Sequence, residues 1–339
     1  MIGFRLDANE QIATGHMMRC IAIAKQCRLL GEDCIFLLAE NKNTAFLEEN
    51  QLEYHVLNID WQDWDSSIPK VIEAINKYRI RCLVVDSYQV TSEFFKELNT
   101  ITKLFYMDDL CRETYAVHMV LHYSQWGDER TIEDLYCKTD TVTYSGLKYV
   151  PLRTEFLQIT EKRKKKQILI ATGGTDPLHF TLRLCKQLLN DAAFDIYDIC
   201  VVLGKMNGDK DEIDMLAKNN KRLKVYQNIK NMSTVMAESV ISVSAGGMTV
   251  YELLACGVPV VCFGFSDDQV VMGEKMDKSG MVIWAGDART DINNVIVNTI
   301  DGLKKYMIED TRNLSLKLKS MVDGKGCERI AKILRESTI

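Results

Sequence analysis

The sequence predicts an α/β protein built from two doubly wound domains that face a cleft. Its 339 residues are too many for one typical domain and suit two of about 150 residues each. Short apolar runs alternate with amphipathic helical stretches along the chain, which is typical of parallel sheets covered on both faces. The rhythm breaks over residues 151–166, where a proline and a charged run coincide. These observations predict two Rossmann-like domains, residues 1–155 and 156–339.

In the first half of the chain, five short apolar runs predict strands at residues 2–6, 34–38, 82–85, 104–107 and 117–121. Helical patterns lie between them at residues 16–30, 68–78 and 92–98. The first helix is the best defined, because Met17, Cys20, Ile21, Ala24 and Cys27 fall on one stripe at helical spacing.

The second half repeats the pattern with five more strands, at residues 168–171, 199–203, 223–226, 240–243 and 258–263. Helices are predicted at residues 177–190, 209–218, 248–256 and 270–279. The stretch 308–339 is also helical in pattern, and its helices can pack back on the first domain.

Composition and charge exclude several classes of function. The net charge is −5, and the one dense basic run, Lys162 to Lys166, is interpreted as a solvated linker, so we expect no nucleic-acid partner. The 11 cysteines include no Cys-x-x-Cys pair and lie mostly in apolar runs, which indicates a reducing, cytoplasmic compartment. No apolar stretch approaches the roughly 18 residues of a membrane span, and no signal peptide is expected. A monomer is compatible with the sequence, which leaves the oligomeric state open.

The first candidate site is the turn between the first strand and the first helix. Ligands of open α/β sheets bind at the carboxyl ends of strands, and Gly15 permits a close approach of the backbone. His16 then stands at a helix N-terminus, where the helix dipole disfavours the imidazolium and leaves a ring that suits a general base. Asp7 is the candidate to orient that ring, with Arg5 and Arg19 nearby. The alternative is that His16 merely caps or packs the helix start.

Two further glycine turns lie in the second half, after the strands predicted at residues 168–171 and 240–243. The first contains Gly173 and Gly174. The second has the residues Ser244, Ala245, Gly246 and Gly247, followed by a helix that carries Thr249, Tyr251 and Glu252. Small side chains let backbone N–H groups at a helix start meet a phosphate, and Glu252 can accept hydrogen bonds from ribose hydroxyls. Either turn alone can be an ordinary strand–helix connection. Their joint presence, with the polar Asp267-Asp268-Gln269 after the next strand, favours a phosphate site.

Several blocks resemble the UDP-sugar hydrolase family of pseudaminic acid biosynthesis, which acts on UDP-2,4-diacetamido-2,4,6-trideoxy-β-L-altropyranose. The blocks, in chain order, are Arg5-x-Asp7-x(7)-Gly15-His16-x-x-Arg19-Cys20, Asp108-Asp109 with Arg112 and Tyr115, Gly146-x-x-Tyr149-x-x-Leu152-Arg153-x-Glu155-Phe156, Gly173-Gly174-x-Asp176-Pro177, the segment from Ser244 to Glu252, and Gln269. They span nearly the whole chain. The second half also resembles the UDP-GlcNAc transferase of peptidoglycan synthesis.

The resemblance implies a glycosyltransferase-B architecture and a hydrolase that releases UDP when water attacks the anomeric carbon. It implies that His16 is the catalytic base, that no metal or other cofactor is needed, and that the product enters the synthesis of nonulosonic acids for surface glycans. The residues that it and the turns assign to substrate binding are Arg5, Gly15, Arg19, Asp86, Tyr88, Gly173, Gly174, Ser244, Ala245, Gly246, Gly247, Thr249, Tyr251, Glu252 and Gln269.

The chain departs from the family pattern at positions that are expected to border the sugar. Asp86-Ser87-Tyr88-Gln89 stands where the family often has Asp-His-Tyr-Gly. His118 and His122-Tyr123-Ser124 replace an aspartate and Asn-Gln-Asn, and Tyr251 stands where an asparagine is found. The UDP site is therefore expected to be kept while the identity of the sugar stays open. Two alternatives remain, a glycosyltransferase that passes the sugar to an acceptor and a binding protein without catalytic activity.

Overall fold

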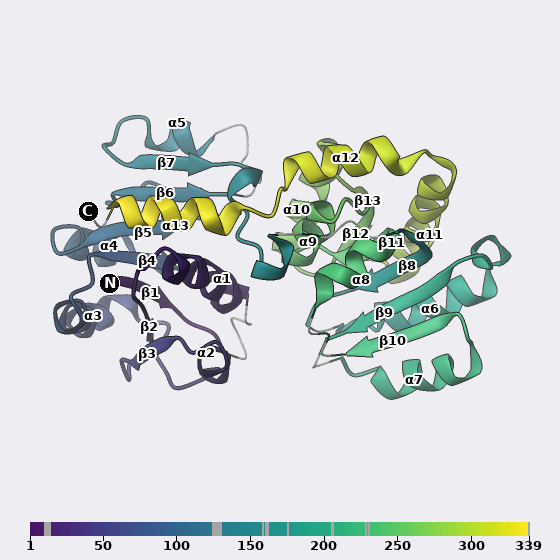
Figure 1. The fold of residues 1–339 in the computed structure, drawn as a ribbon, viewed down its shortest axis with the longest axis horizontal. Coiled ribbons are helices and arrows are strands. Elements are labelled where there is room, and N and C mark those ends of the chain that lie inside the picture. The colour runs from purple at the N-terminus through teal and green to yellow at the C-terminus, as the bar shows by residue number, and fades with distance from the viewer. Residues whose placement is uncertain are drawn as a thin grey trace. The chain divides into compact units, whose positions relative to one another are not determined.

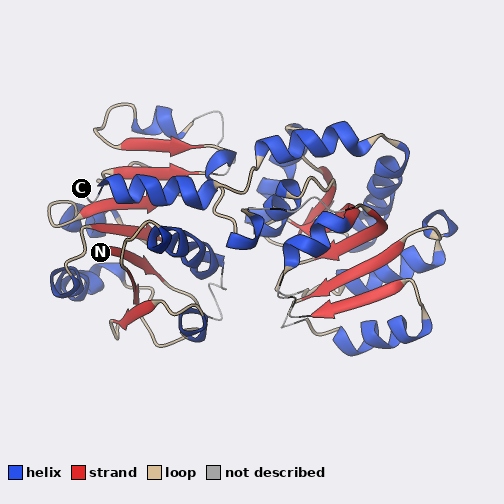
Figure 2. Ribbon diagram, in the orientation of Figure 1, coloured by secondary structure: helices blue, strands red, loops and turns tan. Residues whose placement is uncertain are grey.

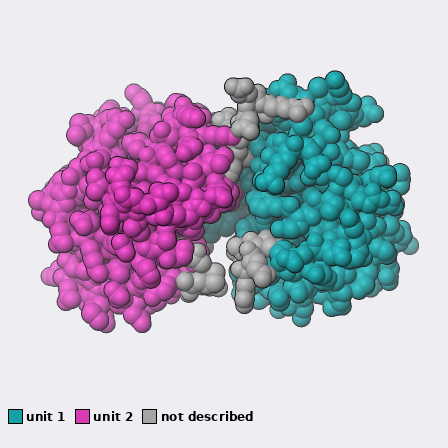
Figure 3. All heavy atoms as spheres, turned by 180° about the vertical axis from the view of Figure 1, so that it is seen from behind, with its two compact units in different colours: residues 1–154, 324–339 teal, residues 155–323 magenta. Residues whose placement is uncertain are grey.

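A computed structural model describes residues 1–9, 15–123, 131–157, 159, 163–174, 176–204, 207–227, 229 and 231–337. The chain forms two compact units, drawn in different colours in Figure 3. Unit 1 contains residues 1–154 and 324–339, and unit 2 contains residues 155–323.

Unit 1 is built on a parallel sheet in the order β3-β2-β1-β4-β5-β6-β7. Its strands are β1 (Ile2–Leu6), β2 (Cys34–Leu38), β3 (Glu53–Val56), β4 (Cys82–Asp86), β5 (Lys103–Met107), β6 (Met119–His122) and β7 (Val142–Ser145). Every residue of β1, β2 and β4 is buried, as expected for strands covered on both faces. The strand order reverses between β1 and β4, which makes this pair the topological switch point at which such sheets bind ligands.

The helices of unit 1 are α1 (Gly15–Leu29), α2 (Ala45–Glu49), α3 (Trp64–Tyr78), α4 (Ser92–Leu98), α5 (Ile132–Tyr136) and α13 (Gly326–Ser337). Two short 3-10 segments lie at Leu147–Tyr149 and Thr154–Phe156. α3 and α4 pack on one face of the sheet around Trp64, Phe94 and Phe95. α1 is buried around most of its circumference, because the sheet covers one side and α13 packs against another (Figure 1).

Unit 2 has a second parallel sheet (Figure 2), and its strands, labelled in Figure 1, follow the order β10-β9-β8-β11-β12-β13. Its strands are β8 (Lys165–Ala171), β9 (Asp198–Leu203), β10 (Leu223–Gln227), β11 (Ser239–Ala245), β12 (Val260–Gly264) and β13 (Ile283–Asp287). Its helices are α6 (Phe180–Asn190), α7 (Lys210–Asn219), α8 (Met232–Glu238), α9 (Met248–Ala255), α10 (Asp267–Lys278), α11 (Ile292–Ile308) and α12 (Thr311–Met321), with a 3-10 segment at Ala192–Phe194. The order reverses between β8 and β11, so this pair is the switch point of unit 2.

The predicted fold class of two Rossmann-like, doubly wound units is confirmed. All ten predicted strands are present, with ends shifted by at most a few residues. Among the strands in the described ranges, β3, β7 and β13 were not predicted; each lies at the edge of its sheet and is largely half-buried or exposed. An edge strand of this kind has no continuous apolar run to signal it. Of the C-terminal helices, α12 is part of unit 2 and α13 is part of unit 1. None of the helices in the described ranges is long and apolar enough to cross a bilayer.

The first glycine turn of unit 2 is supported by a close backbone contact. A Cβ atom on Gly204, just after β9, would lie 2.2 Å from the carbonyl oxygen of Gly174 and 2.4 Å from that of Gly173. Gly173 also has a φ of +97°, which favours glycine. Any larger residue at position 204 would therefore displace the backbone of the turn that follows β8.

We expect Gly204→Ala to lower the free energy of unfolding of unit 2 by about 1–3 kcal/mol, because the backbone must move to admit a methyl group. Gly208→Ala is the matched control, since a Cβ there meets nothing within 4 Å and should change stability by no more than about 0.5 kcal/mol. Urea denaturation followed by circular dichroism measures both, and equal midpoints for the two variants would contradict the expectation.

Candidate active site

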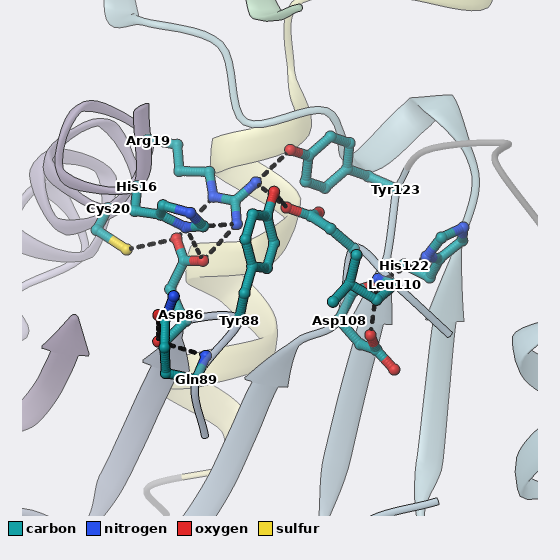
Figure 4. Close-up of polar contacts among 12 residues, drawn as sticks. His16, Arg19, Cys20, Asp86, Tyr88, Gln89, Asp108, Leu110, His122 and Tyr123 are labelled. Carbon is teal, nitrogen blue, oxygen red and sulfur yellow. Dashed lines mark hydrogen bonds and ion pairs between the residues drawn. The ribbon is translucent and has the colours of Figure 1, made fainter. Parts of the chain in front are cut away.

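The switch point of unit 1 gathers ionisable side chains from α1, β4 and the turns that follow β4, β5 and β6 (Figure 4). His16 lies in the first turn of α1, and Asp86 is the last residue of β4. Nδ1 of His16 lies 2.6 Å from Oδ1 of Asp86, and both side chains are buried. The ring of Tyr88 packs edge-on against the imidazole, with 4.8 Å between ring centroids. The imidazole is thus held by a carboxylate on one side and an aromatic ring on another.

Arg19, one turn further along α1, joins the parts of this cluster. Its Nε donates to Oδ2 of Asp86 at 2.6 Å, and its Nη2 donates to Oδ1 of the same carboxylate. Its Nη1 donates to Oδ2 of Asp109 at 2.7 Å and to the hydroxyl of Tyr123. Four of its five N–H groups are therefore bonded inside the protein, and the remaining Nη2 group faces Nδ1 of His16 at 3.1 Å. This corrects the predicted role of Arg19, because the side chain is buried and its guanidinium bonds to groups of the protein.

The charge on Asp86 is set by two opposing effects. Burial alone would raise the pKa of its carboxyl, because a low-dielectric environment disfavours the charged form. The charge of Arg19, together with the hydrogen bonds from Arg19 and His16 to the carboxylate, outweighs burial and holds the pKa of Asp86 well below its ordinary value. Asp86 is therefore an ionised carboxylate at neutral pH.

Asp7 does not orient His16, which corrects a second prediction. Its Oδ2 accepts a hydrogen bond from Arg5 at 2.6 Å, and its Oδ1 accepts one from the backbone N–H of Ala39 at 2.8 Å. The side chain thus bonds toward the segment that follows β2, away from α1. Burial raises the pKa of Asp7 against the effect of Arg5. Both carboxylate oxygens of Asp7 are thus bonded to groups of unit 1.

Arg5 is fully buried, and its guanidinium lies over the ring of Trp64 at 4.3 Å. It therefore cannot reach a substrate, which corrects its predicted role in binding. Gly15 is the exposed first residue of α1 with open space around it, and its predicted contact with a ligand stays a prediction.

The cluster also contains Asp109 and Tyr123, two residues that the analysis of the turns did not assign to the site. Asp109 follows β5, bonds Arg19 and also accepts a hydrogen bond from the hydroxyl of Tyr88 at 3.1 Å. Tyr123 follows β6 and is buried. The available signal was their position, because both are polar groups directly beyond the carboxyl ends of strands in the same sheet.

Residues after β5 and β6 form a second set of contacts beside this cluster. Oδ1 of Asp108 accepts hydrogen bonds from the backbone N–H groups of Leu110 and Cys111, both at 2.9 Å. Nδ1 of His122 donates to the carbonyl oxygen of Asp108 at 2.7 Å. These bonds fix the turn in which Asp109 lies.

In unit 2, the starts of α9 and α10 lie side by side at the carboxyl ends of β11 and β12. Gly247 and Ser266 stand at the N-cap positions of the two helices, and neither makes a side-chain capping bond. A Cβ on Gly246 would lie 2.8 Å from the carbonyl oxygen of Gln269, so the two helix starts are in close contact. Two neighbouring helix N-termini present backbone N–H groups and positive dipole ends to an anion. α6 differs, because the carboxylate of Asp176 accepts from its first two N–H groups at 2.9 and 2.7 Å.

The predicted side-chain contacts of unit 2 are only partly exposed to a ligand. The hydroxyl of Ser244 is buried and donates to the carbonyl oxygen of Ala171 at 2.9 Å, which ties β11 to β8, and the predicted contact of this residue with a ligand stays a prediction. Ala245 and Tyr251 are buried, with 5% and 1% of their surfaces exposed. Gln269 accepts from the N–H of Phe265 at 3.0 Å and so fixes the turn before α10.

Thr249 and Glu252 lie on the first two turns of α9, half-buried and buried respectively. With the backbone of Gly173, Gly174, Gly246 and Gly247, they are the predicted contacts that remain candidates for binding. Within the described ranges, no group of three or more His, Cys, Asp or Glu side chains is arranged to hold a metal ion.

Comparison with known proteins defines the class. Residues 167–270 match the glycosyltransferase family 28 C-terminal domain. The structure is similar to that of MurG from Acinetobacter baumannii, with a TM-score of 0.69 and 12% identity over 98% of this chain and 99% of that one. It is also similar to the glycosyltransferase of kitacinnamycin, with a TM-score of 0.71 and 14% identity over 99% of this chain and 98% of that one. The protein thus has the glycosyltransferase-B fold.

Three relatives narrow the comparison. The UDP-2,4-diacetamido-2,4,6-trideoxy-β-L-altropyranose hydrolase of Campylobacter jejuni is 23% identical over 77% of this chain and 90% of that protein. The spore coat polysaccharide biosynthesis protein SpsG of Bacillus subtilis is 21% identical over 99% of this chain and 98% of that protein. An uncharacterized protein of Methanocaldococcus jannaschii is 24% identical over 75% of this chain, but the match spans only 54% of its own length. The resemblance to the hydrolase family that the motifs indicated is confirmed.

The Asp86 carboxylate makes the stability of unit 1 depend on pH. Its pKa is lower in the folded protein than in the unfolded chain, so its contribution is complete above about pH 4 and is lost as the pH falls further. We expect Asp86→Asn to be less stable than the wild type at pH 7 by about 3–5 kcal/mol, since Arg19 loses a buried partner. The difference should shrink from about pH 4 to about pH 2 in denaturant titrations. A difference that stays constant over this range would show that Asp86 is not ionised in the folded protein.

Proposed function

We propose that the protein is an enzyme of surface-glycan synthesis that hydrolyses a UDP-linked diacetamido-trideoxy sugar and releases UDP. The observation that carries the proposal is the 2.6 Å contact between His16 and Asp86 at the switch point of unit 1. A carboxylate that holds an imidazole in this way sets its orientation and supports its action as a general base. The hydrolase of Campylobacter jejuni, to which the chain is similar, acts by its name on such a UDP-sugar.

Unit 2 is proposed to bind the UDP moiety. The paired helix starts at Gly247 and Ser266 suit a diphosphate, because backbone N–H groups and helix dipoles neutralise its charge without a cation. The matched family 28 domain, residues 167–270, contains both glycine turns and both helix starts. Thr249 is proposed to add a hydroxyl to the diphosphate site, and Glu252 to accept from the ribose.

The proposed reaction needs one proton acceptor and one leaving group. Because the ionised Asp86 can only accept hydrogen bonds, Nδ1 of His16 carries the hydrogen of the neutral ring and Nε2 is left to take a proton. Nε2 removes a proton from water, the water oxygen bonds to the anomeric carbon, and the bond from that carbon to the β-phosphate oxygen breaks. UDP leaves with the bonding electrons, and His16 then returns its proton to solvent.

A cytoplasmic location is also proposed, because none of the 11 cysteines forms a disulfide. The glycosyltransferase-B fold and the family 28 match keep sugar transfer to an acceptor as a second candidate. Incubation with a panel of UDP-linked deoxy-amino sugars and no acceptor separates the two. Release of UDP and free sugar supports hydrolysis, whereas release only after an acceptor is added identifies a transferase.

We expect Gly247→Asp to weaken UDP binding at least about tenfold, because the new carboxylate stands at the helix start proposed to hold the diphosphate. Gly208→Asp, which adds the same charge in open space elsewhere in unit 2, should leave the affinity unchanged. Isothermal titration with UDP gives both values. If Gly247→Asp binds UDP as tightly as the wild type, the diphosphate lies elsewhere.

We expect His16→Asn to lower kcat by about 10²–10⁴-fold, the usual cost of losing a general base. Its affinity for UDP should stay within about twofold, since UDP is proposed to bind to unit 2. Steady-state UDP release and titration with UDP test the two parts separately. Full turnover in the variant would assign the base to another residue, and a parallel loss of UDP binding would make His16 a ligand contact.

A further inference from the structure

Arg19 is a buried guanidinium without access to a ligand, at the centre of the candidate site. It comes from the same helix as His16 and bonds both carboxylate oxygens of Asp86. A buried arginine whose bonds all end inside the protein affects a reaction only through the groups it contacts. The contact that matters here is the short one between Asp86 and the ring of His16.

A distance of 2.6 Å between Nδ1 and Oδ1 requires one hydrogen between the two atoms. In the first arrangement, Nδ1–H donates to an ionised Asp86, and Nε2 is free to accept a proton. In the second, a protonated Asp86 donates to Nδ1, and Nε2 carries the hydrogen of the neutral ring. Only the first arrangement leaves a base, because in the second the nitrogen that faces away from Asp86 is already protonated.

Burial by itself favours the second arrangement, since a carboxylate without water or a cation is costly. Arg19 reverses this preference, because it donates two charge-assisted hydrogen bonds to the ionised form. Apart from the His16 ring itself, the other polar groups that the structure describes around Asp86 do not supply a cation. Cys20 lies 3.4 Å from Oδ2 with its thiol, and Tyr88 and Asp109 add a phenol and a second negative charge.

The same guanidinium holds the opposite side of the imidazole. Arg19 bonds Asp109, which accepts from the hydroxyl of Tyr88, and the Tyr88 ring packs edge-on against His16. The orientation of the His16 imidazole and the nitrogen that carries its hydrogen therefore both depend on Arg19.

We propose that Arg19 is a positioning residue that keeps Asp86 ionised and thereby selects Nε2 of His16 as the reactive nitrogen. The inference rests on the proposed role of His16 as a base, but its first prediction concerns the ring alone. In the wild type at pH 7, Nδ1 carries the hydrogen and Nε2 does not. Without the charge of Arg19, the pair takes up one proton from solvent, so that Asp86 carries the hydrogen it shares with Nδ1 and Nε2 carries the hydrogen of the neutral ring.

The test compares Arg19→Gln, which removes the charge, with Arg19→Lys, which keeps it. Nitrogen-15 NMR of the His16 ring, assigned with His16→Asn, identifies the protonated nitrogen in the absence of any substrate. We expect a hydrogen on Nε2 in Arg19→Gln and on Nδ1 in both the wild type and Arg19→Lys. UDP release by Arg19→Gln should fall by about 10²–10⁴-fold in kcat with little change in KM, and Arg19→Lys should recover most of it.

The pH–rate profile gives a signature that a loss of stability alone would not produce. The acid limb of Arg19→Gln should move to higher pH, because the pKa of the buried Asp86 rises when its cation is gone. Arg222→Gln is the matched control, since Arg222 bonds the carbonyl oxygens of Phe194 and Tyr197 in unit 2, and its loss should leave the profile and the His16 ring unchanged.

An unchanged tautomer and acid limb in a folded Arg19→Gln would overturn the inference. If that variant does not fold, the wild type decides, because a hydrogen found on Nε2 at pH 7 excludes the proposal and one on Nδ1 with an ionised Asp86 supports it. If the wild type releases UDP from no UDP-sugar, the proposed function fails, and the NMR result still decides the role of Arg19.

Discussion

The buried ion pair between Arg19 and Asp86 is the interaction on which the arrangement of unit 1 depends. It joins α1 to the last residue of the central strand β4. Both charged side chains are buried, so a shift of α1 that separates them would leave each without its partner, at a cost of several kcal/mol per ion. Because His16 lies on the same helix, one turn before Arg19, the direction of its ring is fixed by the same constraint.

The two units use the same topology with different chemistry. Both reverse their strand order at the centre of a parallel sheet, and both collect polar groups beyond the carboxyl ends of the strands. In unit 1 these groups are ionisable side chains, which can exchange protons. In unit 2 they are backbone groups at two helix starts, brought together because Gly246 has no side chain to separate them from Gln269. Backbone dipoles suit a constant charge such as a phosphate, whereas side chains suit a charge that changes during a reaction.

The features that were predicted from the sequence are local ones. His16 and the glycine turns are visible as short motifs, and the central strands are visible as apolar runs. The residue that holds the His16 ring was not predicted. Asp7, nine residues from His16, was chosen for this role, whereas the actual partner, Asp86, lies 70 residues away. The register of the sheet decides between them, since Leu6 pairs with Asp86 and the Asp7 side chain then bonds toward Ala39. No short-range pattern states which strand will lie beside β1. The sequence also did not indicate which polar side chains are buried. Arg5, Arg19 and Ser244 were predicted to contact a ligand, and all three are buried in the folded protein.

Because the chain returns to unit 1 after unit 2, the two units differ in when they can fold during translation. α13, residues 326–337, packs against α1, and the thiol of Cys327 donates to the carbonyl oxygen of Leu152 at 3.2 Å. During synthesis, residues 1–154 leave the ribosome long before this helix exists, so the apolar surface of α1 that it covers stays exposed to water. Unit 2, which is continuous in the chain, can fold while unit 1 still waits for its last helix. Unit 1 can therefore be completed only after unit 2 has been translated, because the helix that covers α1 follows unit 2 in the chain.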